Sequence, residues 1–142
     1  MNDGSIDIKD EVLAQLDYVI AGVHSTHKMP KPQMMARVKK AMENPHIDII
    51  SHPTGRLVGK RDEIQHDFDE ILVIAKNTGT ILEINSSPHR LDLRDINIRK
   101  AKNAGVKMII NTDSHQKEQM HLMEYGISQA RRGWSEKKDI IN

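Results

Sequence analysis

The sequence predicts an α/β protein built from about four consecutive strand–helix units. Short apolar runs rich in β-branched residues alternate with longer segments in which apolar residues recur at helical spacing. This alternation favours parallel strands joined by right-handed crossovers. The 142 residues suffice for one modest domain. An open sheet and part of a (β/α) barrel both fit, since four units are too few to close a barrel of about seven or eight strands.

The predicted strands are short and mostly apolar, which is typical of strands buried on both faces of a parallel sheet. They span residues 17–23, 47–50, 80–84 and 106–110. Between them the predicted helices span residues 31–43, 63–77, 94–104 and about 117–132, and a short helix at 9–15 precedes the first strand. Pro45 stops the helix before it. Gly79 and Gly105 stand where the C-terminal caps of the next two helices belong.

Composition excludes several classes of protein. Twenty-one Lys and Arg against twenty Asp and Glu give a net charge of +1, which excludes a strongly basic nucleic-acid module but permits a local basic patch. The chain has no cysteine, so neither disulfides nor a thiolate metal site can form. We expect no membrane association and a cytoplasmic location, because no apolar run approaches about 18 residues and no signal peptide is visible.

Polar side chains follow each predicted strand directly. His24 follows the first strand, His52 the second, Asn85 the third and Asp113 the fourth, at steps of 28, 33 and 28 residues. Each step is about one strand–helix unit. In parallel α/β folds ligands bind at the carboxyl ends of the strands. The sequence therefore predicts one polar site at one edge of the sheet.

Imidazole and carboxylate groups in these loops indicate a metal site. Asp113 and His115 stand two residues apart, and His and Asp without Cys suit zinc, manganese or iron. A single histidine after a strand is more often a capping or surface residue, so the hypothesis depends on the four loops together. His27 is open to either interpretation. Three further histidines are interpreted as solvated or structural: His46, His66 and His121.

Arg56 and Arg90 also follow strand ends. A guanidinium beside metal ligands could clamp a phosphate with two hydrogen bonds. A salt bridge to a nearby carboxylate such as Asp92 is an equal alternative. Lys60 and Arg61 extend Arg56 into a small basic cluster, which either meets a nucleic-acid backbone or is a solvated loop.

Four strings resemble, in order, the later motifs of PHP (polymerase and histidinol phosphatase) domains. They are Ala21-Gly-Val-His24-Ser25, Ile49-Ile-Ser-His52-Pro-Thr-Gly-Arg56, Leu82-Glu-Ile-Asn85-Ser-Ser-Pro-His-Arg90-Leu-Asp-Leu93 and Asn111-Thr-Asp113-Ser-His115. The second and third are most similar to the PHP domain of bacterial and archaeal family X DNA polymerases. The resemblance covers residues 2–133, nearly the whole chain.

The resemblance implies the C-terminal part of a distorted (β/α)7, TIM-like barrel with up to three divalent ions, zinc or manganese, at the carboxyl ends of its strands. By analogy, His24 and His52 would share one metal, Asp113 would serve a second and His115 a third. The remaining site residues that it implies are a phosphate clamp and two substrate contacts: Arg56 and Arg90, and Asn85 and His89.

The motifs that open such a domain, HxHxxxSDG, TDH and a metal-bridging glutamate, do not occur in the chain. Residues 1–5 resemble the stretch that follows this glutamate. The resemblance therefore implies that residues 1–142 form a partial PHP domain without the N-terminal half of its barrel and without polymerase domains. Two unpaired strand edges would favour self-association, and the isolated chain is expected to have little activity.

The implied function is phosphodiester hydrolysis by the intact parent, as a 3′-5′ exonuclease in DNA repair with DNA as its partner. Two alternatives stay open. One is a stand-alone small-molecule phosphatase resembling histidinol phosphatase. The other is a non-catalytic module that binds metal or has a structural role.

Overall fold

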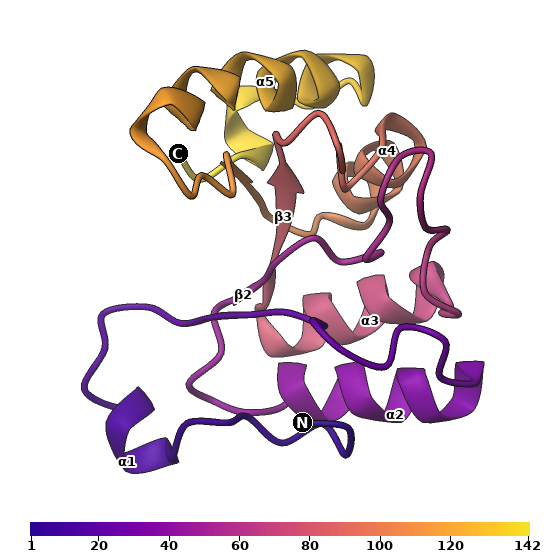
Figure 1. Cartoon of the computed structure of the whole chain (residues 1–142), viewed down its shortest axis with the longest axis vertical. Helices are drawn as coiled ribbons and strands as arrows, with labels where there is room; N and C mark the ends of the chain where they lie inside the picture. Colours follow the sequence, from indigo (N-terminus) through magenta and orange to yellow (C-terminus); the bar gives the residue numbers. More distant parts are fainter.

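The computed structural model describes Met1–Asn142 (Figure 1). It contains one sheet of four parallel strands in the order β1-β2-β3-β4. The predicted parallel, sequential sheet is thereby confirmed. The strands are β1 Ile20–Ala21, β2 Ile49–Ile50, β3 Ile81–Asn85 and β4 Met108–Asn111. The first two are much shorter than predicted, so β3 and β4 form the main part of the sheet.

The helices follow the predicted order: α1 Asp10–Leu13, α2 Lys31–Met42, α3 Phe68–Thr78, α4 Asp95–Ala104 and α5 Met123–Arg132. Short 3₁₀ turns at Lys117–Leu122 and Lys137–Asp139 flank α5. None of the helices combines the length and the apolarity that crossing a membrane requires.

The helix predicted at 63–77 begins later than expected. The carboxylate of Asp67 accepts a hydrogen bond from the Glu70 N–H at 3.2 Å and so caps α3 at its N-terminus. His66 therefore lies in the loop before the helix and not within it. The segment 117–132 is also divided, since only its second half is α-helical.

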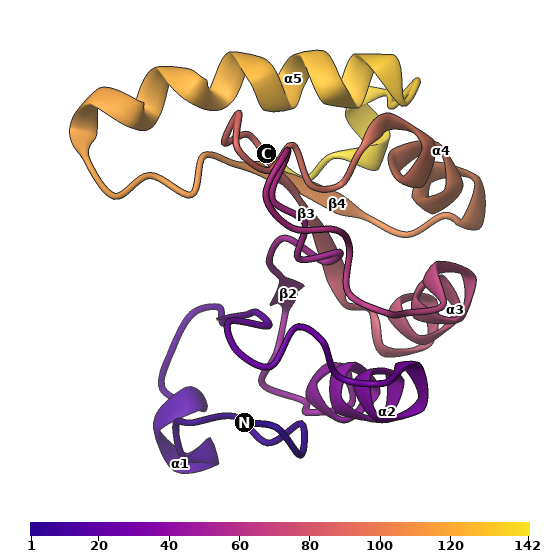
Figure 2. The same cartoon turned by 45° about the vertical axis from the view of Figure 1, so that its right-hand side comes forward.

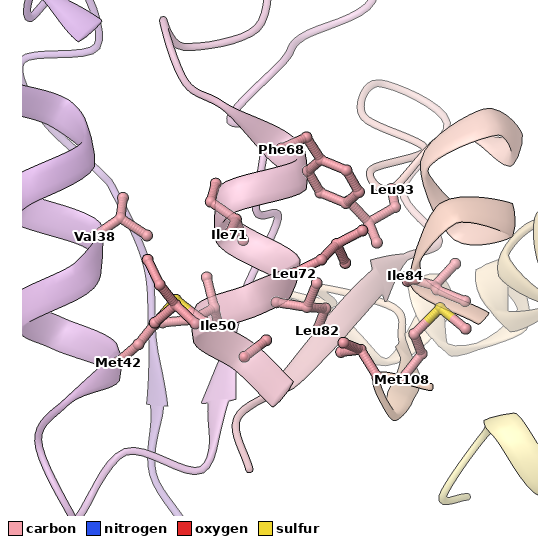
Figure 3. Close-up of a cluster of buried hydrophobic side chains, with 14 of the residues drawn as sticks. Val38, Met42, Ile50, Phe68, Ile71, Leu72, Leu82, Ile84, Leu93 and Met108 are labelled. Carbon is pink, nitrogen blue, oxygen red and sulfur yellow. The ribbon is translucent and has the colours of Figure 1, made fainter. Parts of the chain in front are cut away.

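Helices α2, α3 and α4 lie in a row along one face of the sheet, and α5 continues the row past α4 (Figure 2). Alternate strand residues face these helices and are buried, as the period of a strand requires. They pack with α2 and α3 side chains in the cluster of Figure 3, which includes Val38, Met42, Ile71, Leu72, Leu82, Ile84 and Met108. Burial of this face fixes which residues of each strand must face the other way.

The other face of the sheet carries no row of helices (Figure 2). On β3 that face presents Glu83 and Asn85, both buried, while on β4 it presents the half-buried Ile109 and Asn111. The expectation of strands buried on both faces is therefore correct for β3 and wrong for β4. The polar residues of the second face lead directly into the loops at the carboxyl edge.

One of the two sheet edges is closed by the C-terminal residues. Ile140 forms a parallel bridge with Met108, and the Ile141 N–H donates to the Met108 carbonyl at 3.0 Å. The side chain of Asn142 accepts from the Ile110 N–H at 3.1 Å and donates to its carbonyl at 2.8 Å. The expectation of two unpaired edges is therefore wrong for β4, and only the β1 edge is open.

A glycine in α5 permits close packing on the sheet. A Cβ at Gly126 would press into the Ser86 Oγ and lie 2.5 Å from the Ile110 Cγ2.

Replacing Gly by Ala inside a helix normally stabilises by about 1 kcal/mol, whereas overpacking costs about 1–3 kcal/mol. We predict that Gly126→Ala lowers the free energy of unfolding by up to about 2 kcal/mol in urea denaturation. The exposed Ser128 of the same helix is the control, and Ser128→Ala should change stability by less than about 0.5 kcal/mol. Stabilisation by Gly126→Ala would contradict the close approach.

Candidate metal centre

The four strand-end loops lie at the same edge of the sheet. Because all four strands are parallel, their carboxyl ends point in one direction. The β3–β4 register pairs Asn85 with Asn111, so these two strands end together. His24 and His52 follow the ends of β1 and β2 by two or three residues.

The imidazoles of His24 and His52 are neighbours. Their ring centroids are 5.1 Å apart and the rings meet edge to face at 86°. Gly22 makes this approach possible, because a Cβ there would lie 2.9 Å from the His24 Cε1 and 3.1 Å from the His52 Cε1. His24 is exposed and His52 is buried. One ring of the pair is therefore accessible from solvent and the other is enclosed by the protein.

His52 is a neutral imidazole at neutral pH. Burial, with smaller contributions from the positive charge of Arg90 and from the nearby His24, lowers the pKa of His52 to about 4, and Asp113 opposes the shift. The buried Nδ1 of His52 has no hydrogen-bond partner. A neutral ring is the form that binds a metal, because its lone pair is not protonated.

Asp113 is paired with Arg90. The Arg90 Nε donates to the Asp113 Oδ2 at 3.2 Å, and the buried Nη1 of Arg90 has no partner. Asp113 itself has φ 55°, in the left-handed region that is unfavourable for most residues. His115 is exposed, and its Nδ1 lies 2.8 Å from the Asp113 carbonyl oxygen of its own loop. The fourth loop thus offers a carboxylate held by an arginine and a histidine directed toward its own backbone.

These side chains fit a metal site only in part. Two adjacent imidazoles, one with an unpartnered buried nitrogen, suit one ion. No three His, Asp or Glu side chains lie close enough together to hold a metal. A structural zinc site needs four ligands and a catalytic one about three. The ligands that would complete the first shell are therefore not assembled by this chain.

Arg56 and Asp92 join the second and third loops reciprocally. The Arg56 guanidinium donates to the carbonyls of Arg90 at 2.7 Å and Leu91 at 2.5 Å. The Asp92 carboxylate accepts from the Thr54 N–H at 3.0 Å and from its hydroxyl at 2.9 Å. The salt-bridge alternative for Arg56 is not observed, because its Nε and Nη2 donate to backbone carbonyls, and its role as a phosphate clamp stays a prediction. The Arg56 bonds hold the backbone of Arg90, whose side chain bonds to Asp113.

The two expected substrate contacts have different environments. Asn85 is fully buried, donates to the Glu83 Oε2 at 3.0 Å and accepts from the Ser87 N–H at 3.0 Å. The structure therefore bonds Asn85 to its neighbours within the protein, and its contact with substrate stays a prediction. His89 is exposed on the turn of the third loop, where its carbonyl accepts from the Val58 N–H at 2.8 Å.

Two buried charged residues were not singled out from the sequence. Glu83 lies beneath the site, and burial raises its pKa while hydrogen bonds from His52, Asn111 and Asn85 oppose that shift. Arg37 of α2 donates to the carbonyl of Ser25 at 2.9 Å and so holds the loop that follows His24. For Glu83 the signal available in the sequence was a single charge within an apolar strand. For Arg37 it was a single charge on the apolar face of a helix.

The burial of Asp92 makes stability depend on pH. Burial raises the pKa of Asp92 to about 6, against hydrogen bonds from Thr54 that lower it, whereas an unfolded Asp titrates near 4. The native state therefore binds this proton more tightly, and the stability that Asp92 contributes is full below about pH 4 and lost as the pH rises through about 6. The lowered pKa of His52 has the opposite effect on stability, because the stability that His52 contributes is lost as the pH falls toward about 4.

We predict that the stability difference between the wild type and Asp92→Asn isolates the effect of Asp92. The free energy of unfolding of the wild type, minus that of the variant, should fall by up to about 3 kcal/mol between pH 4 and pH 7. Urea denaturation of both proteins across this range measures it. A difference that grows with pH would contradict the raised pKa.

Comparison with known proteins gives relatives of two kinds, while no family model matches the chain. The chain is 45% identical over 140 residues to the DNA polymerase/3′-5′ exonuclease PolX of Bacillus subtilis, which is 99% of the chain and 25% of that protein. It is 30% identical over 122 residues to a probable phosphatase of Thermoanaerobacter sp. (strain X514), covering 80% of the chain and 47% of the phosphatase. A probable phosphatase of Clostridium acetobutylicum is 33% identical over 123 residues, 80% of the chain and 48% of that protein.

The chain thus spans about a quarter of the length of the polymerase and about half the length of the phosphatases. The match to the polymerase extends over all four strand-end loops, since it leaves only two residues of the chain uncovered. Similarity over almost the whole chain confirms the resemblance that the four motifs indicated, to the PHP domain of family X DNA polymerases.

Proposed function

We propose that this chain is the C-terminal half of a PHP barrel, and that the intact protein is a metal-dependent phosphoesterase that acts as a 3′-5′ exonuclease in DNA repair. The observation that carries the proposal is the pair of adjacent imidazoles at the carboxyl edge of the sheet, of which the buried His52 is neutral. The relatives named as an exonuclease and as probable phosphatases support the same chemistry.

Each loop would contribute one function to hydrolysis. His24 and His52 would hold one divalent ion, zinc or manganese, through neutral nitrogens, and Asp113 and His115 would each serve a further ion. Such ions lower the pKa of bound water and neutralise charge on the phosphoryl oxygens. Arg90 has a guanidinium nitrogen without a partner, so it is the better phosphate clamp of the two arginines.

The open β1 edge is where the missing half of the barrel would dock. Large apolar side chains are exposed around it: Ile8, Val12, Leu16, Tyr18 and Ile20. The groove along this edge is lined by Leu13, Val19, Ile20 and His24. A parallel strand added there would end beside His24 and could bring the ligands that this chain does not assemble. Until it docks, the exposed apolar edge favours self-association.

Two other functions keep specific support. The phosphatase relatives, only about twice the length of the chain, favour a small phosphoester as substrate. The incomplete ligand set favours a non-catalytic, structural module. The basic cluster adds little to the case for DNA, because the guanidiniums of Arg56 and Arg61 both donate to backbone carbonyls.

The first test compares metal-dependent hydrolysis by the intact protein and its variants. With Mn²⁺ or Zn²⁺ we expect cleavage of a 3′-recessed DNA, and His52→Ala or Asp113→Ala should lower the rate by more than about 100-fold. His66→Ala, which changes a histidine bonded to the Ile64 carbonyl, is the matched control and should keep the activity. The isolated chain should retain at most roughly a few per cent of the hydrolysis rate of the intact protein, because it does not bring enough metal ligands together.

The choice of substrates separates the three functions. Faster turnover of histidinol phosphate than of DNA would favour the small-molecule phosphatase. No turnover of either substrate by the intact protein with both metals would favour the structural module. Turnover by the isolated chain near the rate of the intact protein would contradict the incomplete site.

Gly22 tests the geometry of the imidazole pair. An added methyl group at this position would press into the Ser51 Oγ and against both rings, so we expect Gly22→Ala to displace the rings and to weaken Zn²⁺ binding by at least about tenfold. Calorimetric titration of the intact protein measures the affinity. Unchanged affinity would mean that the two histidines do not share an ion.

A further inference from the structure

We infer that Glu83 is the positioning residue of this site, whose buried carboxylate fixes His52 and the loop of Asp113 relative to each other. The inference rests on the proposed function, because it assigns Glu83 a role in metal binding. Glu83 is 3% exposed and lies in the middle of β3. It would touch neither metal nor substrate, and would act through the residues that do.

The Glu83 carboxylate bonds to residues at the ends of three strands. Its Oε2 accepts from the His52 backbone N–H at 2.6 Å and from the Asn85 Nδ2 at 3.0 Å. Its Oε1 accepts from the Asn111 Nδ2 at 3.0 Å. Because β3 pairs with β2 on one side and with β4 on the other, a side chain of β3 can reach both neighbours. Glu83 thereby ties the end of β2 to the end of β4.

The three groups that donate to this carboxylate are all neutral. No Lys or Arg forms an ion pair with Glu83, so the hydrogen bonds from His52, Asn85 and Asn111 alone compensate its burial. A buried carboxylate that loses such partners is costly, and hydrogen bonds to a charged acceptor are stronger than neutral ones. The free-energy cost of burying the Glu83 carboxylate therefore depends on the positions of the strand-end loops that carry its donors.

These bonds act on the loops of two of the five non-glycine residues with positive φ. His52 has φ 29° and Asp113 has φ 55°, both in the left-handed region. The bond to Glu83 holds the His52 N–H directly, and Asn111 stands two residues before Asp113. In that conformation the His52 ring lies beside His24. Weakening the bond frees both loops to relax independently.

The test separates positioning from general stability. Glu83→Gln keeps the size of the side chain but removes its charge and turns an NH₂ toward one of the three donors. We expect the affinity of the intact protein for Zn²⁺, measured by calorimetry, to fall at least about tenfold. Leu82→Val is the matched control, because Leu82 is its neighbour on β3, is buried against the helices and makes none of these bonds. This control should unfold more easily and bind Zn²⁺ as the wild type does.

A second readout does not depend on metal. Amide hydrogen exchange at His52 should be slow in the wild type and in Leu82→Val, and at least about tenfold faster in Glu83→Gln. Asn111→Ala, which removes one donor and leaves the carboxylate charged, should give a smaller loss of Zn²⁺ affinity and decides the question if Glu83→Gln does not fold.

Failure of the positioning role of Glu83 and failure of the proposed function would give different results. Wild-type Zn²⁺ affinity and wild-type exchange in Glu83→Gln, or equal losses in Leu82→Val, would overturn the positioning role of Glu83. A wild type that binds no Zn²⁺ would overturn the proposed function, and the exchange at His52 would then decide on Glu83 alone.

Discussion

The parallel pairing of β3 with β4 is the constraint on which the strand-end loops depend. Leu82 pairs with Met108 and Asn85 with Asn111, so the two strands end together at the edge of the sheet. Because Leu82 and Ile84 are buried against the helices, Glu83 must lie on the opposite face. A slip of one residue would move Glu83 into the apolar cluster. The register of an apolar core thus determines where the charged group beneath the site lies.

Polar groups at this edge divide into those with partners and those without. Arg56 and Asp92 use their donors and acceptors on the neighbouring loop. The buried nitrogens without partners are the Nδ1 of His52 and the Nη1 of Arg90. Groups that are satisfied within the protein support the loops, and unsatisfied ones are available to a ligand. This division assigns the supporting roles and the binding roles to different residues.

Much of the fold follows from patterns that are local in the sequence. Apolar periodicity is sufficient to predict four strands in order, and therefore the single edge at which the loops lie. The features that it misses depend on bonds between distant residues, such as those from Arg56 to the third loop and from Asn142 to β4. The start of α3 was misplaced because Ile64 fits the helical spacing although Asp67 caps the helix. The position of Asn85 at a strand end did not indicate that the alternation of β3 buries its side chain.

The account depends on one ion shared by His24 and His52, and a crystal structure of the intact protein with Mn²⁺ or Zn²⁺ tests it most directly. Anomalous scattering at the absorption edge of the metal locates the ion. We predict an anomalous peak within bonding distance of one nitrogen of each ring, with a metal–nitrogen distance of about 2.0–2.1 Å for Zn²⁺. A peak bonded to neither ring, or to only one of them with the other turned away, would contradict it.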